Sequence, residues 1–247
     1  MRFALIGQPN CGKSTLFNQV AGYRAETGNF SGTTTTFTES KVRVLGQIVD
    51  LVDLPGTYTL AGTNPAERVV FQYLESQPVD VIINILDASH LAQGLNLTLE
   101  LMELGIPIVA AANMMDEIAR MGIGLDGQTL EDLLGIRMLP LVASKSRGVR
   151  KLFVTAMEEA QQKSVPPRQP FSADLEVAIQ KLVVTLNGQS TLLGSDGFAI
   201  KLLEGETSLI DRMKSQIPGI QNTLDEAQQN IQTSYGQNAI WVINAER

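Results

Sequence analysis

The chain has 247 residues, 44% of them hydrophobic and 18% charged, with a formal net charge of −7. This size and composition provide a core for one large or two modest domains, and the acidic balance argues against a nucleic-acid-coating surface. A single cysteine, Cys11, excludes an intrachain disulfide and suits a reducing compartment. The amino terminus lacks a signal-peptide layout, and the apolar runs are shorter than the roughly 20 residues of a membrane-spanning helix. We therefore expect a soluble cytoplasmic piece.

Short apolar runs alternate with helical patterns over the first part of the chain. Strands are expected at 2–6, 41–45, 48–52, 80–86, 106–112 and 138–142, with helices among the intervening segments at 13–21, 65–75 and 92–104. Buried parallel strands read as near-continuous apolar runs, so the alternation predicts an α/β fold with a mostly parallel sheet flanked by helices. Ligands of such sheets bind beyond the carboxyl ends of the strands.

The composition changes at 164–170, where "SVPPRQP" holds three prolines and reads as a linker. Beyond it, 171–247 shows helical periodicity, with breaks at "NGQS", "IPG" and "YGQN". We expect a first domain over 1–163, a linker over 164–170 and a small all-helical domain over 171–247.

The loop after the first expected strand reads "GQPNCGKS". Its pattern, G-x-x-x-x-G-K-S, is that of a phosphate-binding loop, in which the glycines allow backbone N–H groups and the next helix N-terminus to face a β-phosphate. Lys13 is expected to reach the β- and γ-phosphate oxygens, and Ser14 to place its hydroxyl on Mg²⁺. The predicted nucleotide-binding residues here are Gly7, Gln8, Pro9, Asn10, Cys11, Gly12, Lys13, Ser14 and Thr15.

A second motif, "DLPG", closes the strand expected at 48–52. The Asp53 carboxylate is expected to hold a Mg²⁺-bound water, and Gly56 allows its N–H to approach a γ-phosphate. Between the two motifs lies "TGNFSGTTTTFTESK", a Thr-rich stretch with glycines that we interpret as a switch loop. One of its threonines would complete the Mg²⁺ shell. Chemistry alone leaves open which one, and a plain edge strand is the alternative.

The motif "NMMD" over 113–116 indicates which base is bound. The Asp116 carboxylate accepts hydrogen bonds only, so it can take the two donors on the Watson–Crick edge of guanine, a pair that adenine lacks. Asn113 and Met114 are included in the predicted site, although the methionines are expected chiefly to pack. After the last expected strand, Ala143, Ser144 and Lys145 lie where backbone N–H groups would meet guanine O6.

Together these motifs resemble the guanine-nucleotide-binding domain of ferrous iron transport protein B, a prokaryotic Fe²⁺ transporter. The resemblance covers about 1–155 and rests on "GQPNCGKSTLFNQVAG", "GNFSGTTT", "VDLPGTYTL", "DASHLAQGLNLTLELMELGIP" and "NMMDE". It implies a P-loop GTPase fold, and the helical 171–247 would fit the family's second cytosolic domain. It also implies attachment to a membrane domain at the cytoplasmic face of the inner membrane, with a small accessory protein as a further possible partner.

Carried over by position, the family's switch threonine falls on Thr34, beside Gly32 and Thr33 in the predicted site. The family's phosphate-loop asparagine falls on Asn10, as a ligand of a K⁺ that stimulates hydrolysis. The resemblance therefore implies Mg²⁺ held by Ser14, Thr34 and, through water, Asp53. The chain departs from the family pattern at Cys11, at 30–31 and at 143–145.

The expected catalytic residues are Asn10, Lys13, Thr34 and Gly56. Thr57 follows Gly56 where many GTPases have a water-positioning glutamine, so slow intrinsic hydrolysis of GTP is predicted, with K⁺ supplying positive charge. Arg24 and Arg68 are weaker candidates for that charge, and His90 is interpreted as a surface or capping residue.

Two alternatives remain from the sequence. One is a GDP/GTP-binding conformational switch with negligible turnover. The other is an RNA-associated GTPase of the Era-like group, against which the acidic charge counts.

Overall fold

The structure is a computed structural model that describes residues 1–21, 26–29, 36–186 and 192–247. The chain forms two compact units. The first comprises Met1–Met102 and Ile106–Pro167, and the second comprises Glu103–Gly105 and Arg168–Arg247.

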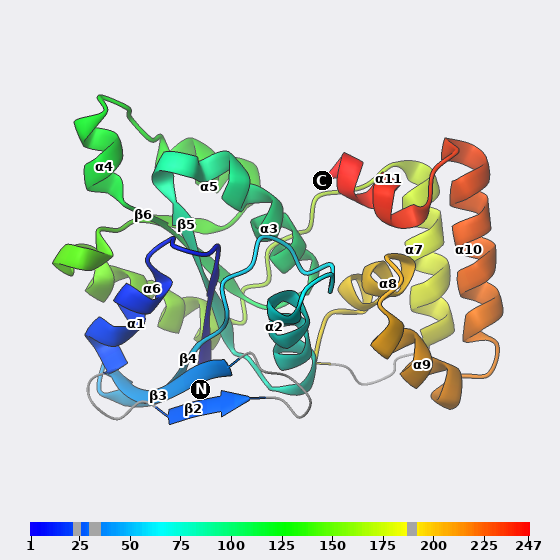
Figure 1. The fold of residues 1–247 in the computed structure, drawn as a ribbon, viewed down its shortest axis with the longest axis horizontal. Coiled ribbons are helices and arrows are strands. Elements are labelled where there is room, and N and C mark those ends of the chain that lie inside the picture. The colour runs from blue at the N-terminus through cyan, green and yellow to red at the C-terminus, as the bar shows by residue number, and fades with distance from the viewer. Residues whose placement is uncertain (22–25, 30–35, 187–191) are drawn as a thin grey trace. The chain divides into compact units, whose positions relative to one another are not determined.

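The first unit is built on a seven-stranded sheet of order β2-β3-β4-β1-β5-β6-β7 (Figure 1). The strands are β1 (Arg2–Gly7), β2 (Glu26–Asn29), β3 (Thr36–Val44), β4 (Gln47–Asp53), β5 (Val81–Asp87), β6 (Ile108–Asn113) and β7 (Arg137–Pro140). In the part of the sheet β4-β1-β5-β6-β7, adjacent strands are parallel. Strand β3 runs antiparallel to both β2 and β4. This mixed, mostly parallel sheet confirms the predicted fold class.

Helices cover both faces of the sheet (Figure 1). They are α1 (Lys13–Ala21), α2 (Pro65–Ser76), α3 (Leu91–Glu103), α4 (Met115–Arg120), α5 (Gly127–Leu134) and α6 (Val149–Gln162), with short 3₁₀ turns η1 (Ala88–His90) and η2 (Ala143–Lys145). Apolar side chains of α1 and α6 form a core with one face of the sheet. The opposite face carries α2 and α3 (Figure 1). Because β5 is covered on both faces, every residue from Val81 to Leu86 is buried.

The expected strands and helices are present with shifts of one or two residues at most ends, but β3 begins at Thr36, well before the expected start at 41. Leu45, placed in a strand by the sequence, instead has φ 48° and forms the β3–β4 turn with Gly46. The turn suits the right-handed twist of the two strands. Strand β6 begins at Ile108 because Pro107 has no N–H to donate.

Strand register brings the loops of interest to one edge of the sheet. In the parallel pairs, Leu5 lies opposite Asp53, Gly7 opposite Ile85, and Asp87 opposite Asn113. The carboxyl ends of β1, β4, β5 and β6 therefore lie along one edge of the sheet, where ligands of such sheets bind.

The second unit is helical. Its helices are α7 (Ala173–Leu186), α8 (Ser195–Leu203), α9 (Thr207–Gln216), α10 (Ile220–Tyr235) and α11 (Ala239–Glu246). Gly236, with φ 69°, caps α10, and the Asn238 side chain accepts from the Trp241 N–H to begin α11. Two of the expected breaks, at 217–219 and 235–238, therefore lie at helix ends, while the third lies outside the described residues. Among the described residues, no helix combines the length and hydrophobicity needed to cross a bilayer.

Candidate nucleotide-binding site

The phosphate-binding loop joins β1 to α1 and lines a cavity of about 460 Å³. The cavity is bounded by Gln8, Pro9, Asn10, Gly12, Lys13, Ser14 and Thr15, together with Gly56 and Met114. Residues predicted from three separate motifs are thus brought to one cavity, beyond the carboxyl edge of the sheet.

The loop backbone takes conformations that explain its glycines. Gly12 has φ +91°, and a Cβ there would lie 2.1 Å from Asn113 Nδ2. A Cβ on Gly56 would lie 2.9 Å from the Cα of Pro9. Both positions therefore need the absence of a side chain. Asn10, with φ 65°, is a non-glycine residue in the left-handed region, a conformation that clusters at functional sites.

The side chains of Lys13, Ser14 and Asp53 meet where β4 ends beside α1. The Ser14 hydroxyl donates to Asp53 Oδ2 at 2.9 Å, and Lys13 forms an ion pair with Asp53 Oδ1. Hydroxyl and carboxylate oxygens are the ligands that Mg²⁺ prefers, so these two side chains fit a magnesium site shared with phosphate oxygens. Within the described part of the chain, no group of three or more His, Cys, Asp or Glu side chains could hold a metal ion by itself.

Asn113 connects the phosphate-binding loop to the 143–145 loop. Its Nδ2 donates to the Cys11 carbonyl at 2.8 Å, and its Oδ1 accepts from the Ala143 N–H at 2.9 Å. The side chain is 3% exposed. One asparagine at the end of β6 therefore fixes the distance between the loop for phosphate and the loop for the base.

Asp116 follows at the start of α4, beside Lys145. Lys145 Nζ donates to Asp116 Oδ2 at 2.6 Å, and this hydrogen bond lowers the pKa of Asp116 below its ordinary value. The preceding Met114 has φ 63°, and the Met115 N–H donates to the Leu141 carbonyl. The lowered pKa keeps the Asp116 carboxylate ionised beside η2, and an ionised carboxylate can accept two hydrogen bonds.

The segment after Gly56 contains functional candidates that the sequence analysis missed. The Thr57 N–H donates to the Gly7 carbonyl at 3.1 Å, and the Leu60 N–H donates to Glu100 Oε2 of α3 at 2.8 Å. Glu67, at the start of α2, accepts from Thr59 Oγ1 at 3.0 Å. Glu100 occupies the buried stripe of α3, where an acidic residue among leucines is the one signal that could have identified it.

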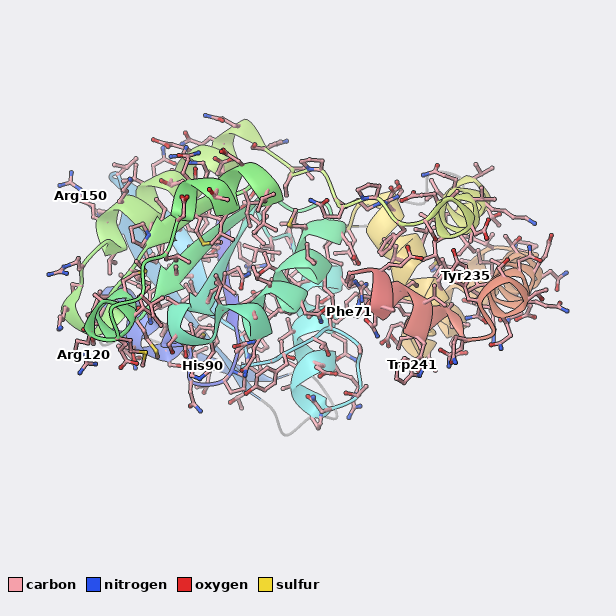
Figure 2. The ribbon with its side chains drawn as sticks, turned by 90° about the horizontal axis from the view of Figure 1, so that it is seen from above. Phe71, His90, Arg120, Arg150, Tyr235 and Trp241 are labelled. Atoms are coloured by element: carbon pink, nitrogen blue, oxygen red, sulfur yellow. The ribbon has the colours of Figure 1, made fainter. Side chains whose placement is uncertain are left out.

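Cys11 is buried in the phosphate-binding loop, whereas His90 lies at the surface, as expected. Cys11 is 1% exposed, and burial raises the pKa of its thiol from 9.0 to about 11. His90 points outward from the first unit (Figure 2), with Nδ1 3.2 Å from Asp87 Oδ2. Although partial burial of Asp87 acts to raise its pKa, hydrogen bonds from Ser89 and His90 lower it overall.

The predicted switch loop is described only at its two ends. Its start and finish belong to β2 and β3, where Asn29 pairs with Thr36. Gly32, Thr33 and Thr34 lie outside the described residues, as do Arg24 and the 30–31 pair. Arg68 donates its Nη1 to the Gly62 carbonyl at 2.9 Å.

The sequence matches two family models, one over each part of the chain. Residues 1–156 match the model described as ferrous iron transport protein B, and residues 171–247 match the cytosolic helical domain of the same proteins. A fusion protein of Fe(2+) transport protein A and the Fe(2+) transporter FeoB from Porphyromonas gingivalis is 38% identical over 217 residues, covering 85% of this chain and 26% of that protein. The FeoB transporter of Salmonella typhimurium is 41% identical over 156 residues, covering 62% of this chain and 20% of that protein.

Solved structures agree with these matches. A mutant NFeoB from S. thermophilus bound to GDP is 26% identical with a TM-score of 0.87, covering 100% of this chain and 95% of that one. The cytosolic domain of L. pneumophila FeoB is 29% identical with a TM-score of 0.81, covering 100% of this chain and 94% of that one. The chain therefore spans about a fifth of the Salmonella transporter's length and about a quarter of the fusion protein's length. It belongs to the ferrous iron transport protein B family, of which it carries the GTP-binding domain and the cytosolic helical domain.

Proposed function

We propose that this chain binds GTP with Mg²⁺, hydrolyses it slowly with stimulation by K⁺, and thereby regulates or energises ferrous iron uptake by an attached membrane domain. The observation that carries the proposal is the cavity that joins the phosphate-binding loop, Gly56 and Met114, with Asn113 and Asp116 beside it. Membership in the transporter family favours this function over that of an RNA-associated GTPase.

The guanine end of the site is formed by Asp116 and the 143–145 loop. The Asp116 carboxylate would accept from the two donors of the guanine edge, and backbone N–H groups of Ala143, Ser144 and Lys145 would face O6. Each hydrogen bond to a charged group contributes about 1.5–3 kcal/mol, so two give at least a 100-fold preference for guanine.

The phosphate end would be formed by Lys13 and the loop backbone, with Ser14 as a ligand of Mg²⁺ and Asp53 holding the ion through a water. A Mg²⁺ held there would supply positive charge to the phosphate groups. Thr34, outside the described residues, is proposed as the switch-loop ligand of the same ion. Gly56 lies against Pro9 of the phosphate-binding loop, so its N–H would lie beside a γ-phosphate held there.

Asn10 is the proposed ligand of the activating K⁺. Its side chain is exposed and lies on the loop that lines the cavity, so its carboxamide oxygen is free to bind a cation. Arg68, in α2, donates to the Gly62 carbonyl, which favours a K⁺ at Asn10 over Arg68 as the source of the charge. With Thr57 after Gly56, positioning of the attacking water falls to backbone groups, which accounts for slow hydrolysis.

The site would act at the cytoplasmic face of the bacterial inner membrane, on the membrane domain of the same transporter. The fusion protein of P. gingivalis, which joins Fe(2+) transport protein A to FeoB, supports a small accessory protein as a further partner.

The test is GTP hydrolysis with Mg²⁺ in KCl against NaCl, on the parent chain and on Asn10→Ala. We expect K⁺ to accelerate the parent and to leave the mutant unaffected. Equal rates of the parent in both salts would refute the role of K⁺. Binding of GTP without turnover in either salt would replace the enzyme by a conformational switch.

A further inference from the structure

The loop that follows Gly56 is anchored at both ends by backbone N–H groups. At its start, the Thr57 N–H donates to the Gly7 carbonyl of the phosphate-binding loop at 3.1 Å. Three residues later, the Leu60 N–H donates to Glu100 Oε2 at 2.8 Å. Leu60 is fully buried and Glu100 is 1% exposed, so the second anchor is shielded from water.

Glu100 lies where a leucine would be expected. Its neighbours on the buried side of α3 include Leu97 and Leu101, both fully buried. Asn96 Nδ2 donates to the other carboxylate oxygen, Oε1, at 3.2 Å. Burying a carboxylate is costly unless hydrogen bonds compensate it, so a side chain of this kind is better explained by the group that it holds than by packing.

The group that it holds belongs to the segment on which hydrolysis depends. The chain has no glutamine after Gly56, so the Gly56–Thr57 backbone must position the γ-phosphate and the water by itself. Backbone donors stabilise a transition state only where they are fixed in advance. Gly56 already lies against Pro9, and the Thr57 anchor holds one side of the segment. The Leu60 anchor holds the other side.

We propose that Glu100 is a positioning residue for GTP hydrolysis, which fixes the 57–60 loop through the Leu60 N–H so that the Gly56 backbone stays aimed at the phosphate-binding loop. The inference rests on the proposed hydrolysis of GTP. It makes α3, a helix that contributes no side chain to the cavity lining, part of the catalytic arrangement.

The test compares Glu100→Leu, Glu100→Gln and a matched control, Thr98→Val. Thr98 is fully buried on the same helix, accepts from Asn84 Nδ2 at 2.6 Å and donates to the Gly94 carbonyl at 3.1 Å, neither of which belongs to the loop. Multiple-turnover hydrolysis is measured over a range of GTP concentrations, and kcat is expressed per site that binds fluorescent GDP, together with the KM for GTP. Counting binding-competent sites removes any loss of rate that merely reflects unfolded protein.

A misplaced loop lowers the rate without weakening the ground-state complex, so Glu100→Leu is expected to lose about 10-fold in kcat with KM changed less than about 3-fold. Glu100→Gln keeps an oxygen that accepts from Leu60 and is expected within about 3-fold of the parent. Thr98→Val is expected at the parental rate. If Glu100→Leu fails to fold, Glu100→Asp serves instead, since its shorter side chain withdraws the acceptor while keeping the charge, and the same loss is expected.

A parental kcat in Glu100→Leu, or in Glu100→Asp where that variant replaces it, would overturn the proposal. So would an equal loss in Thr98→Val. A parent chain that binds GTP but never hydrolyses it would remove the proposed enzyme function and this inference together, whereas a hydrolysing parent with insensitive Glu100 variants would remove the inference alone.

Discussion

Replacing Asn113 with alanine is expected to weaken GDP binding by separating the two halves of the site. The substitution removes both hydrogen bonds of the side chain, to the Cys11 carbonyl at 2.8 Å and from the Ala143 N–H at 2.9 Å. Cys11 and Ala143 are each 1% exposed, so the two backbone groups lose their partners in a shielded place. At about 1–3 kcal/mol for each group left unsatisfied, the free energy of unfolding of the first unit falls by about 2–6 kcal/mol.

The assay separates this loss of stability from the loss of binding. Urea unfolding gives the first quantity, and titration with fluorescent GDP under conditions where the protein stays folded gives the second. Because the loops for phosphate and for the base are no longer held together, we expect at least about 10-fold weaker GDP binding, or 1.4 kcal/mol. Asn84→Ala is the control, since Asn84 is fully buried on the neighbouring strand and hydrogen-bonds Thr98 rather than either loop. Parental GDP affinity in Asn113→Ala, or an equal loss in Asn84→Ala, would refute the reasoning.

Three further outcomes are expected. Burial raises the pKa of Cys11 from 9.0 to about 11, which lowers its thiolate fraction at pH 8 about 100-fold. Iodoacetamide should therefore modify the native chain at least about 100-fold more slowly than the urea-unfolded chain. Equal rates of modification would contradict the burial of the thiol. Hydrogen bonds from Arg168 lower the pKa of Glu176, so the stability that this carboxylate contributes is present above its unfolded pKa and lost as pH falls through its folded pKa. Glu176→Gln should therefore destabilise the second unit by about 1 kcal/mol at pH 7, and by less in acid, when measured by thermal unfolding. A loss of stability that does not change with pH would contradict the ion pair as its cause. Asp116→Asn should bind GTP about 100-fold more weakly and favour xanthosine triphosphate in competition titrations, and unchanged GTP affinity would remove Asp116 from the base site.

The features that the sequence predicted well are those with local signals. The parallel strands are continuous apolar runs, and the phosphate-binding loop is one short motif between a strand and a helix. By contrast, β2 has the sequence "ETGN", which lacks any β-branched or aromatic residue except Thr27. It is a strand because it pairs with β3, with Glu26 opposite Glu39, and such a partner cannot be read from four residues.

The parts of the site that escaped prediction depend on contacts between distant segments. Glu100 is 40 residues from Leu60, and Asn113 is 102 residues from Cys11. The motif at 113–116 identified Asn113 as a site residue, but its pattern does not say which backbone groups the side chain joins. Those partners follow from the register of β1, β5 and β6, which brings both loops to one edge of the sheet.

The geometry also indicates how recognition of the base and of the phosphates is coupled. Lys13 and Ser14 tie the phosphate-binding loop to Asp53, while Lys145 ties the 143–145 loop to Asp116. Of the side-chain hydrogen bonds described for these motifs, those of Asn113 alone join the two groups. A change at Asp116 should therefore alter the choice of base while leaving the Lys13–Asp53 arrangement in place. A change at Asn113 should weaken binding of any nucleotide that uses both ends of the site, whichever base it carries.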